Sequence, residues 1–149
     1  MTKINDLSLI RCPSAQPSAD GLVIGVVAGT AEARRIGYLT EPQPVTQEIL
    51  ALAGPVAPAQ VFRMAAPCMG EGCKHFAGGD CHLVKRIVAA LDPVVSGLPP
   101  CQIRPTCRWF RQEGRAACVR CPQVVTNTYD ATELQRRVAD PDSDGPDPS

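Results

Sequence analysis

The chain has few aromatic residues and no long apolar run. Three Phe, two Tyr and one Trp are its only aromatic residues, so a hydrophobic core has to come mainly from Val, Ile, Leu and Ala. The most apolar stretch, residues 22–28, is far too short to span a bilayer. Residues 1–12 also lack the apolar run of a secretory signal. We therefore expect a cytoplasmic protein with no membrane segment.

The chain also has no excess of positive or negative charge. Fifteen Lys and Arg balance fifteen Asp and Glu, which gives no general attraction to nucleic acid or to anionic membranes. The sequence also has no phosphate-binding G-x-x-x-x-G-K-[ST] loop, no H-E-x-x-H motif and no C-x3-C-x2-C run of the radical-SAM type. These absences favour a protein that is not itself an enzyme.

Proline and glycine, by contrast, are plentiful. The chain has 15 prolines and 12 glycines, which indicate many loops. Apolar and β-branched segments predict strands at 22–28, 35–39 and 60–66. The first two are separated by a short Gly-containing turn, so we expect them to form a hairpin.

Three short helices are predicted around these strands. Thr46 can cap a helix through Ala53, and Asp80 can cap a second helix whose apolar face packs on the sheet. A capping box at 130–133 opens the third. The predicted fold class is α+β: a small sheet with a hairpin and two or three short helices, plus a loop-rich cysteine region at 93–128.

The same signals predict the domain organisation. A chain of this length forms one domain, which the predicted elements place at 21–139. Residues 1–20 carry prolines and small polar residues, and we expect a flexible arm there. The tail at 140–149 has four aspartates, three prolines and no basic residue, so we expect it to be disordered.

Cysteine is the residue that the chain has in excess. Seven of the eight cysteines fall between residues 68 and 121, and packing alone does not require such crowding. Stable disulfides are uncommon in the cytoplasm, where clustered cysteines more often bind metal or carry out thiol chemistry. Cys12 lies 56 positions before the next cysteine, so we expect it to be a free thiol in the arm.

The C-terminal cysteines have the spacing C-x5-C-x10-C-x2-C. The short pair, Cys118 and Cys121, can place two thiolates of one turn on the same metal. Segment 101–121 also carries five arginines against a single acid, Glu113, and this positive charge offsets that of bound thiolates. We predict one cofactor site of four cysteines, formed by Cys101, Cys107, Cys118 and Cys121.

The N-terminal cysteines follow the pattern C-x4-C-x7-C and are one ligand short of a tetrahedral set. The missing ligand can be His75, His82 or Cys101. Two partitions therefore stay open, in which Cys101 completes either the C-terminal site or the N-terminal one. We prefer the first because it needs only a local loop. The candidate metal ligands of the N-terminal site are then Cys68, Cys73, Cys81, His75 and His82.

The cysteine spacing favours an iron–sulfur cluster over zinc. Zinc ribbons usually present two short C-x2-C hairpins, whereas this chain has one short pair among gaps of 4, 5, 7 and 10 residues. Pro122 follows the pair directly, as at the end of a bacterial ferredoxin run. We expect a [4Fe–4S] cluster, with zinc as the alternative and dithiol chemistry at Cys118 and Cys121 as a third alternative.

The block at 100–126 contains the runs P-C-Q-I-R-P-T-C-R-W-F-R-Q and A-C-V-R-C-P-Q-V-V-T. It is similar to a small cysteine-rich bacterial family, whose cyanobacterial members are loosely labelled nitrogen-fixation proteins. The resemblance implies a metal-site protein and no particular reaction. We expect a cytosolic iron–sulfur protein that carries electrons for a protein redox partner or is an accessory protein to a larger enzyme.

The alternative function is that of a zinc-stabilised binding module. Its arginines, together with Trp109 and Phe110, would form the surface that docks a protein or a nucleic acid. The zero net charge argues against nucleic acid as the partner.

Overall fold

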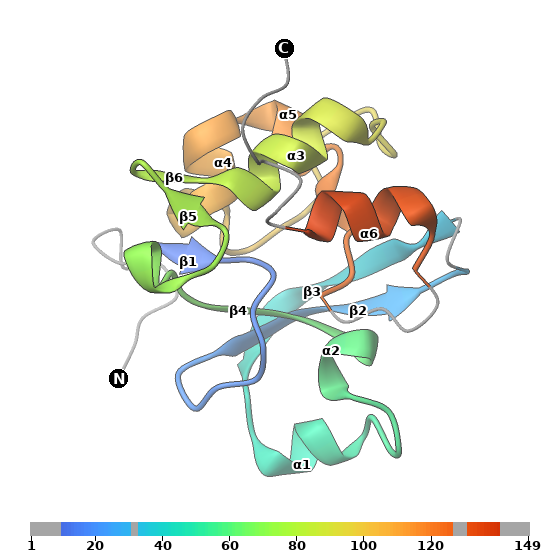
Figure 1. Cartoon of the computed structure of the whole chain (residues 1–149). Coiled ribbons are helices and arrows are strands. Elements are labelled where there is room, and N and C mark those ends of the chain that lie inside the picture. The colour runs from blue at the N-terminus through green and yellow to red at the C-terminus, as the bar shows by residue number, and fades with distance from the viewer. Residues whose placement is uncertain (1–9, 31–32, 127–130, 141–149) are drawn as a thin grey trace.

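A four-stranded antiparallel sheet forms the centre of the computed structural model, which describes residues 10–30, 33–126 and 131–140 (Figure 1). Its strand order is β1-β4-β2-β3, so neighbouring strands come from distant parts of the chain. β5 and β6 form a separate two-stranded ribbon. The strands are β1 (Arg11–Cys12), β2 (Leu22–Ala28), β3 (Arg35–Pro44), β4 (Phe62–Pro67), β5 (Phe76–Ala77) and β6 (Asp80–Cys81).

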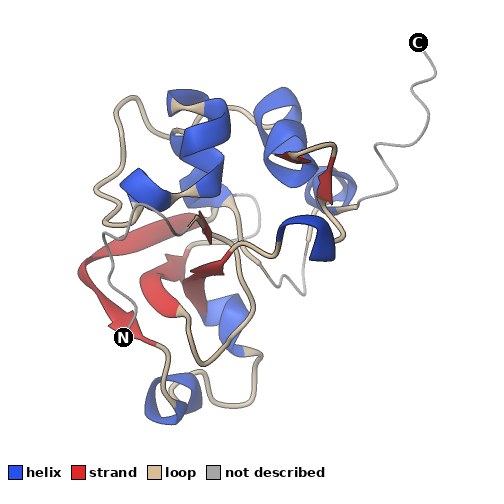
Figure 2. Cartoon of the chain, turned by 90° about the vertical axis from the view of Figure 1, so that its left-hand side faces the viewer, coloured by secondary structure: helices blue, strands red, loops and turns tan. Residues whose placement is uncertain are grey.

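Helices lie on both sides of this sheet. α1 and α2 are on one side, and α3, α4, α5 and α6 are on the other with the β5–β6 ribbon (Figures 1 and 2). The helices are α1 (Gln47–Ala51), α2 (Pro58–Val61), α3 (His82–Ala90), α4 (Arg108–Glu113), α5 (Arg115–Cys118) and α6 (Glu133–Ala139). Three 3-10 turns are η2 (Gly70–Gly72), η3 (Arg104–Thr106) and η4 (Cys121–Gln123).

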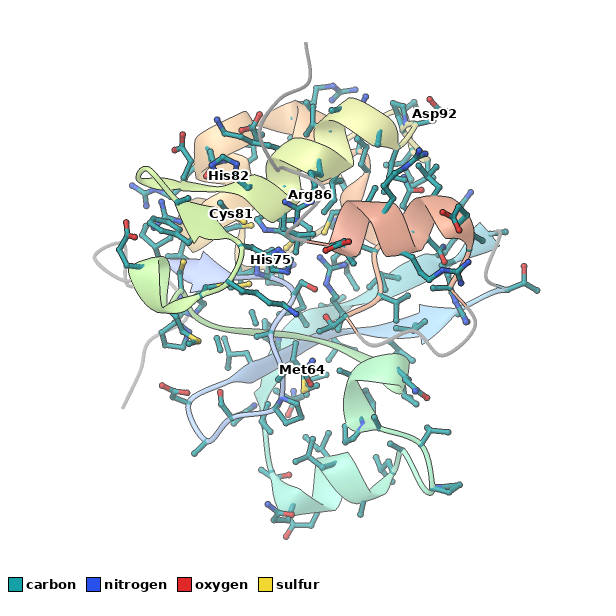
Figure 3. All side chains as sticks on the ribbon, viewed as in Figure 1. Met64, His75, Cys81, His82, Arg86 and Asp92 are labelled. Carbon is teal, nitrogen blue, oxygen red and sulfur yellow. The ribbon has the colours of Figure 1, made fainter. Side chains whose placement is uncertain are left out.

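Side chains that alternate along the strands divide the core in two. Val23 and Met64 pack on the side of α1 and α2. Ile24 and Ala65 belong to the other cluster, with the apolar residues of α3 and the buried Trp109. Figure 3 shows Met64 on the α2 side of the sheet, away from α3. The helical layer that contains the cysteines is thus packed on one face of the sheet.

The predicted α+β class is confirmed. β2 and β3 pair as the predicted antiparallel hairpin, and the strand predicted at 60–66 is β4. Thr46 caps α1, since its side chain accepts a hydrogen bond from the Ile49 amide at 3.2 Å. The second helix, α3, shares a core with Ile24 of the sheet, as its apolar face predicted.

The region at 93–128 is less loop-rich than predicted. Its described part contains α4, α5, η3 and η4, elements too short to leave a clear hydrophobic period in the sequence. Gly114, with φ of 66°, breaks the helical stretch into two. The cap of α6 also differs: Thr132 and Gln135 exchange hydrogen bonds of 3.1 and 2.9 Å, in place of the predicted box at 130–133.

The flanks of the domain are described only in part. Within the arm predicted at 1–20, Arg11–Cys12 forms β1, and residues 1–9 lie outside the described residues. Of the tail predicted to be disordered at 140–149, only Asp140 is described. None of the helices in the described parts of the chain has the length and apolar character needed to cross a membrane.

The β2–β3 pairing depends on a glycine at the centre of the sheet. A Cβ at Gly25 would lie 2.5 Å from Cγ2 of Ile36 and 2.9 Å from the carbonyl oxygen of Gly37. We expect Gly25→Ala to lower the free energy of unfolding by about 1–3 kcal/mol through overpacking. At Gly37 a Cβ has its nearest neighbour at 3.9 Å, so Gly37→Ala is the matched control. Equal urea midpoints for the two variants would contradict the expectation.

Candidate metal centres

The four C-terminal cysteines are brought together around one cavity. Cys101 precedes η3, Cys107 precedes α4, Cys118 ends α5 and Cys121 begins η4. Short elements that turn sharply thus direct four side chains from 21 residues of sequence to one place. The cavity measures about 20 Å³ and is also lined by Pro13, Ile24, Tyr38, Pro99, Arg104, Trp109, Phe110 and Ala117.

Backbone amides lie near two sulfur atoms of this C-terminal site. The amide of Phe110 near Cys107 and that of Ile103 near Cys101 favour the thiolate of each cysteine. Burial works in the other direction and, with the charge of neighbouring thiolates, raises the pKa of Cys107 to about 12. Without a metal these thiols keep their protons at neutral pH, so metal binding must release protons.

Arg63 is the strongest positive group at the C-terminal site. It is fully buried in β4, and its Nη2 donates to Cys121 Sγ at 2.9 Å. Burial is the largest single effect and lowers the pKa of this guanidinium, but the interactions with Cys121, Tyr38 and Cys107 together outweigh it, so the pKa is raised overall. Burial also raises the pKa of the neighbouring Tyr38, which stays neutral. Arg63 therefore directs a buried positive charge at the sulfur of Cys121.

The N-terminal cysteines surround a second, larger cavity. Cys68 follows β4, Cys73 follows η2, and Cys81 ends β6. Cys81 also takes the N-cap position of α3 that the sequence assigned to Asp80, because Asp80 pairs with Ala77 in the ribbon. The cavity has a volume of about 1370 Å³ and opens to the surface between the arm and α6.

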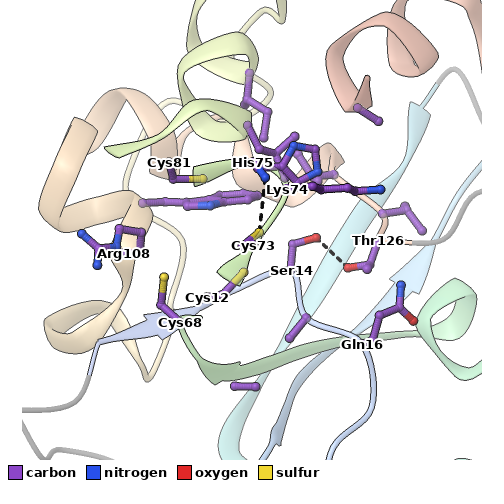
Figure 4. Close-up of a pocket in the computed structure, with 18 of the residues that line it drawn as sticks. Cys12, Ser14, Gln16, Cys68, Cys73, Lys74, His75, Cys81, Arg108 and Thr126 are labelled. Carbon is purple, nitrogen blue, oxygen red and sulfur yellow. Dashed lines mark hydrogen bonds between the residues drawn. The ribbon is translucent and has the colours of Figure 1, made fainter. Parts of the chain in front are cut away.

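A fourth thiol, that of Cys12, lies at this second cavity. Figure 4 shows the side chains of Cys12, Cys68, Cys73 and Cys81 gathered around one space, with Arg108 beside them. Burial, together with the charges of Cys81 and Cys68, raises the pKa of Cys12 to about 11. Cys12, which the sequence predicts as a free thiol remote from the others, is thus an electrostatic neighbour of the N-terminal group.

Both candidate histidines already have hydrogen-bond partners. His75 Nδ1 lies 2.8 Å from Arg86 Nη2, and His82 Nε2 lies 3.2 Å from the Ala77 carbonyl oxygen. His75 lines the cavity of the N-terminal group, whereas His82 does not. Figure 3 shows both with Cys81 on the α3 side of the sheet. The third candidate, Cys101, is placed with the C-terminal cysteines.

One residue, Trp109, lies between the two cysteine groups. Trp109, 1% exposed, lines both cavities, and its Nε1 has no hydrogen-bond partner in the described residues. The Arg63 guanidinium lies 5.2 Å from the centre of the indole ring. Arg108, at the N-terminal cavity, likewise has a buried Nε without a partner among the described residues. Each of these donors is available to a bound anionic group.

Within residues 10–30, 33–126 and 131–140, no three His, Cys, Asp or Glu side chains stand close enough together to hold a single metal ion. The cysteines of each group border a space instead of meeting at one point. All eight thiols are free, without a disulfide between them.

Cys12 and Arg63 are the site residues that sequence reasoning missed. One signal for Cys12 was present: Cys12-Pro13 repeats the Cys121-Pro122 dipeptide that ends the C-terminal group. For Arg63 the sequence gives no signal beyond an arginine within a predicted strand. No known family model, curated protein or solved structure matches this chain. The resemblance to the cysteine-rich bacterial family therefore stays a prediction.

Proposed function

We propose that this chain is a cytoplasmic iron–sulfur protein that holds a [4Fe–4S] cluster at Cys101, Cys107, Cys118 and Cys121. The observation that carries the proposal is the fully buried Arg63, which donates to Cys121 Sγ at 2.9 Å beside a cavity lined by the four thiols. The cluster would serve one-electron transfer to a redox partner or support a larger enzyme.

The Arg63 contact supports thiolates over neutral thiols. A buried guanidinium costs several kcal/mol unless an anion faces it, and among the described residues no carboxylate lies within 4 Å of Arg63. Four thiolates around a [4Fe–4S] core leave a net negative charge, which satisfies this requirement. Backbone amides near cluster ligands tune the reduction potential of such clusters, and those of Ile103 and Phe110 lie near Cys101 and Cys107.

The cysteine spacing supports a cluster over zinc. The gaps between the cysteines are irregular, and Pro122 follows the last of them. A cubane binds each thiolate through a different iron atom, whereas one zinc ion takes all four sulfurs at about 2.3 Å from a common point.

The alternative, a zinc-stabilised docking module, loses part of its support. That proposal placed Trp109 and Phe110 on an exposed surface for a protein or nucleic acid. Trp109 is 1% exposed, and Phe110 is half-buried against the same core. An indole inside the core cannot stack on a base of a bound nucleic acid.

Iron analysis of the full chain tests the proposed function. We expect anaerobically purified protein to be brown, to absorb at about 400 nm and to contain iron and acid-labile sulfide. Cys118→Ser should lose the cluster of the C-terminal site, because a hydroxyl that stays protonated is a poor ligand. Ala116→Ser, on the same helix, should keep it. A colourless wild type that binds zinc, or equal iron in the two variants, would overturn the proposal.

A further inference from the structure

We propose that Cys12 completes a second site, so that Cys12, Cys68, Cys73 and Cys81 hold a second iron–sulfur cluster. The inference rests on the proposed function only for the type of cofactor. It assigns four thiolates to the N-terminal group, where the sequence supplies three and a histidine.

Strand pairing fixes Cys12 at this site. β1 adds to the edge of the sheet with Cys12 opposite Ala66, and the Cys68 amide donates to the Ile10 carbonyl at 2.8 Å. The arm continues along β4, where the Ala15 amide donates to the Met64 carbonyl at 2.9 Å. Backbone hydrogen bonds therefore hold Cys12, on β1, close to Cys68, which directly follows β4.

Side chains tie the same arm to the C-terminal site. Arg63 Nε donates to the Pro13 carbonyl at 2.5 Å, and the hydroxyls of Ser14 and Thr126 lie 2.6 Å apart. These contacts leave the segment that carries Cys12 little freedom to move away from the cavity.

The other two thiols are positioned from the opposite side of the cavity. The ribbon and α3 present Cys81 at the N-terminus of α3, where the nearby amides of Leu83 and Val84 lower the pKa of its thiol against the effect of burial. Cys73 Sγ accepts a hydrogen bond from the His75 amide at 3.5 Å. Backbone amides thus lie near sulfurs of both groups.

The cavity also offers hydrogen-bond donors without a partner among the described residues to a bound cluster. Arg108 lines it and stacks at 5.2 Å on Phe76. Its buried Nε lacks a partner among the described residues, as does Nε1 of Trp109 on the same wall. An anionic cluster with sulfide acceptors fits these two donors, because a buried donor without a partner is costly. A cavity lined by neutral thiols alone leaves them without an acceptor.

A second cluster would lie across Trp109 from the first, since Trp109 lines both cavities. An isolated backbone bridge joins Arg11, the neighbour of Cys12, to Cys107 of the C-terminal site. The geometry thus points to a two-cluster electron-transfer protein.

Iron counts on cysteine variants of the full chain test the inference. We expect the wild type, reconstituted anaerobically with ferrous iron and sulfide, to bind about eight iron and eight sulfide per chain, as two [4Fe–4S] clusters require. Cys12→Ala and Cys68→Ala should each keep about half of both. The retained half reports that the rest of the chain is folded. Ala19→Ser, at an exposed position of the same arm that does not line the cavity, should match the wild type.

Other outcomes separate this inference from the proposed function. A wild type with about four iron, lost in Cys118→Ser and unchanged in Cys12→Ala, overturns the second site alone. If His75→Gln or His82→Gln loses half of the iron and Cys12→Ala loses none, a histidine is the fourth ligand. That result also overturns the second site as proposed. A wild type without iron and sulfide overturns the proposed function and the second cluster with it.

Discussion

Replacing Arg63 with methionine is expected to lower the free energy of unfolding of the iron-loaded protein by about 3–5 kcal/mol. The guanidinium is fully buried and donates to the carbonyl oxygens of Pro13, Cys121 and Val124 at 2.5, 2.9 and 3.0 Å. Its fourth contact is Cys121 Sγ at 2.9 Å. The variant therefore removes a donor from three carbonyls, of which that of Cys121 keeps the Val124 amide, and leaves the charge of a thiolate-bound cluster without this cation.

Arg63→Met also distinguishes a site of charged thiolates from a site of neutral thiols. Where the thiols are neutral and bind nothing, removal of Arg63 costs its hydrogen bonds to three carbonyls but also relieves the core of a buried cation that faces no anion, so these two effects oppose each other. Where the thiols are thiolates on a cluster, removal of Arg63 leaves their negative charge without a compensating cation in the core. Anaerobic urea unfolding, followed by cluster absorbance and by far-UV circular dichroism, measures the difference. A stability equal to or above the wild type would contradict the charged site.

The matched control for Arg63 is Arg111→Met. Arg111 lies on α4 in the same layer, is exposed and makes one hydrogen bond, from Nη1 to the Pro105 carbonyl at 3.2 Å. We expect its replacement to change the free energy of unfolding by no more than about 0.5 kcal/mol. Arg63→Lys should fall between the two, since an ammonium cannot donate in the forked geometry of the guanidinium.

How much of the site the sequence could predict depends on how local its contacts are. Cys101, Cys107, Cys118 and Cys121 lie within 21 residues, so their spacing alone was enough to group them. Cys12 could not be grouped in this way, because it reaches its neighbours through the β1–β4 pairing. Pairing between distant strands is decided by the whole sheet and leaves no periodic signal in a two-residue strand.

The fold shows the same limit. The β2–β3 hairpin is local and rich in β-branched residues, and it was predicted correctly. α4 and α5 were missed, because helices of 6 and 4 residues show less than two turns of any pattern. Trp109 was placed on the surface because its neighbours are arginines, yet it faces inward between the two cysteine groups. Burial of one residue in a charged run depends on what the rest of the chain packs against it.

Removal of the iron is expected to unfold one layer of the molecule and leave the other. The core on the α1–α2 side, with Val23, Phe62 and Met64, contains no cysteine. The opposite core includes Cys81, Cys107 and the helices that follow them. Binding free energy at a thiolate metal site is largely folding free energy. We therefore expect the described part of 93–126 to lose its order in the metal-free state, while β2, β3 and β4 persist.

Amide hydrogen exchange on a reduced, chelated sample measures this loss. Protection of the α4 and α5 amides should fall by at least about 100-fold, which corresponds to about 2.7 kcal/mol of local stability. Amides of Val23 and Met64 serve as the internal control and should change much less. The expectation has a direct cause in Arg63, whose buried charge loses the anionic cluster that it would face once the metal is gone. Unchanged protection across α4 and α5 would show that packing around Trp109 suffices to hold this layer, and the metal would then have no structural role there.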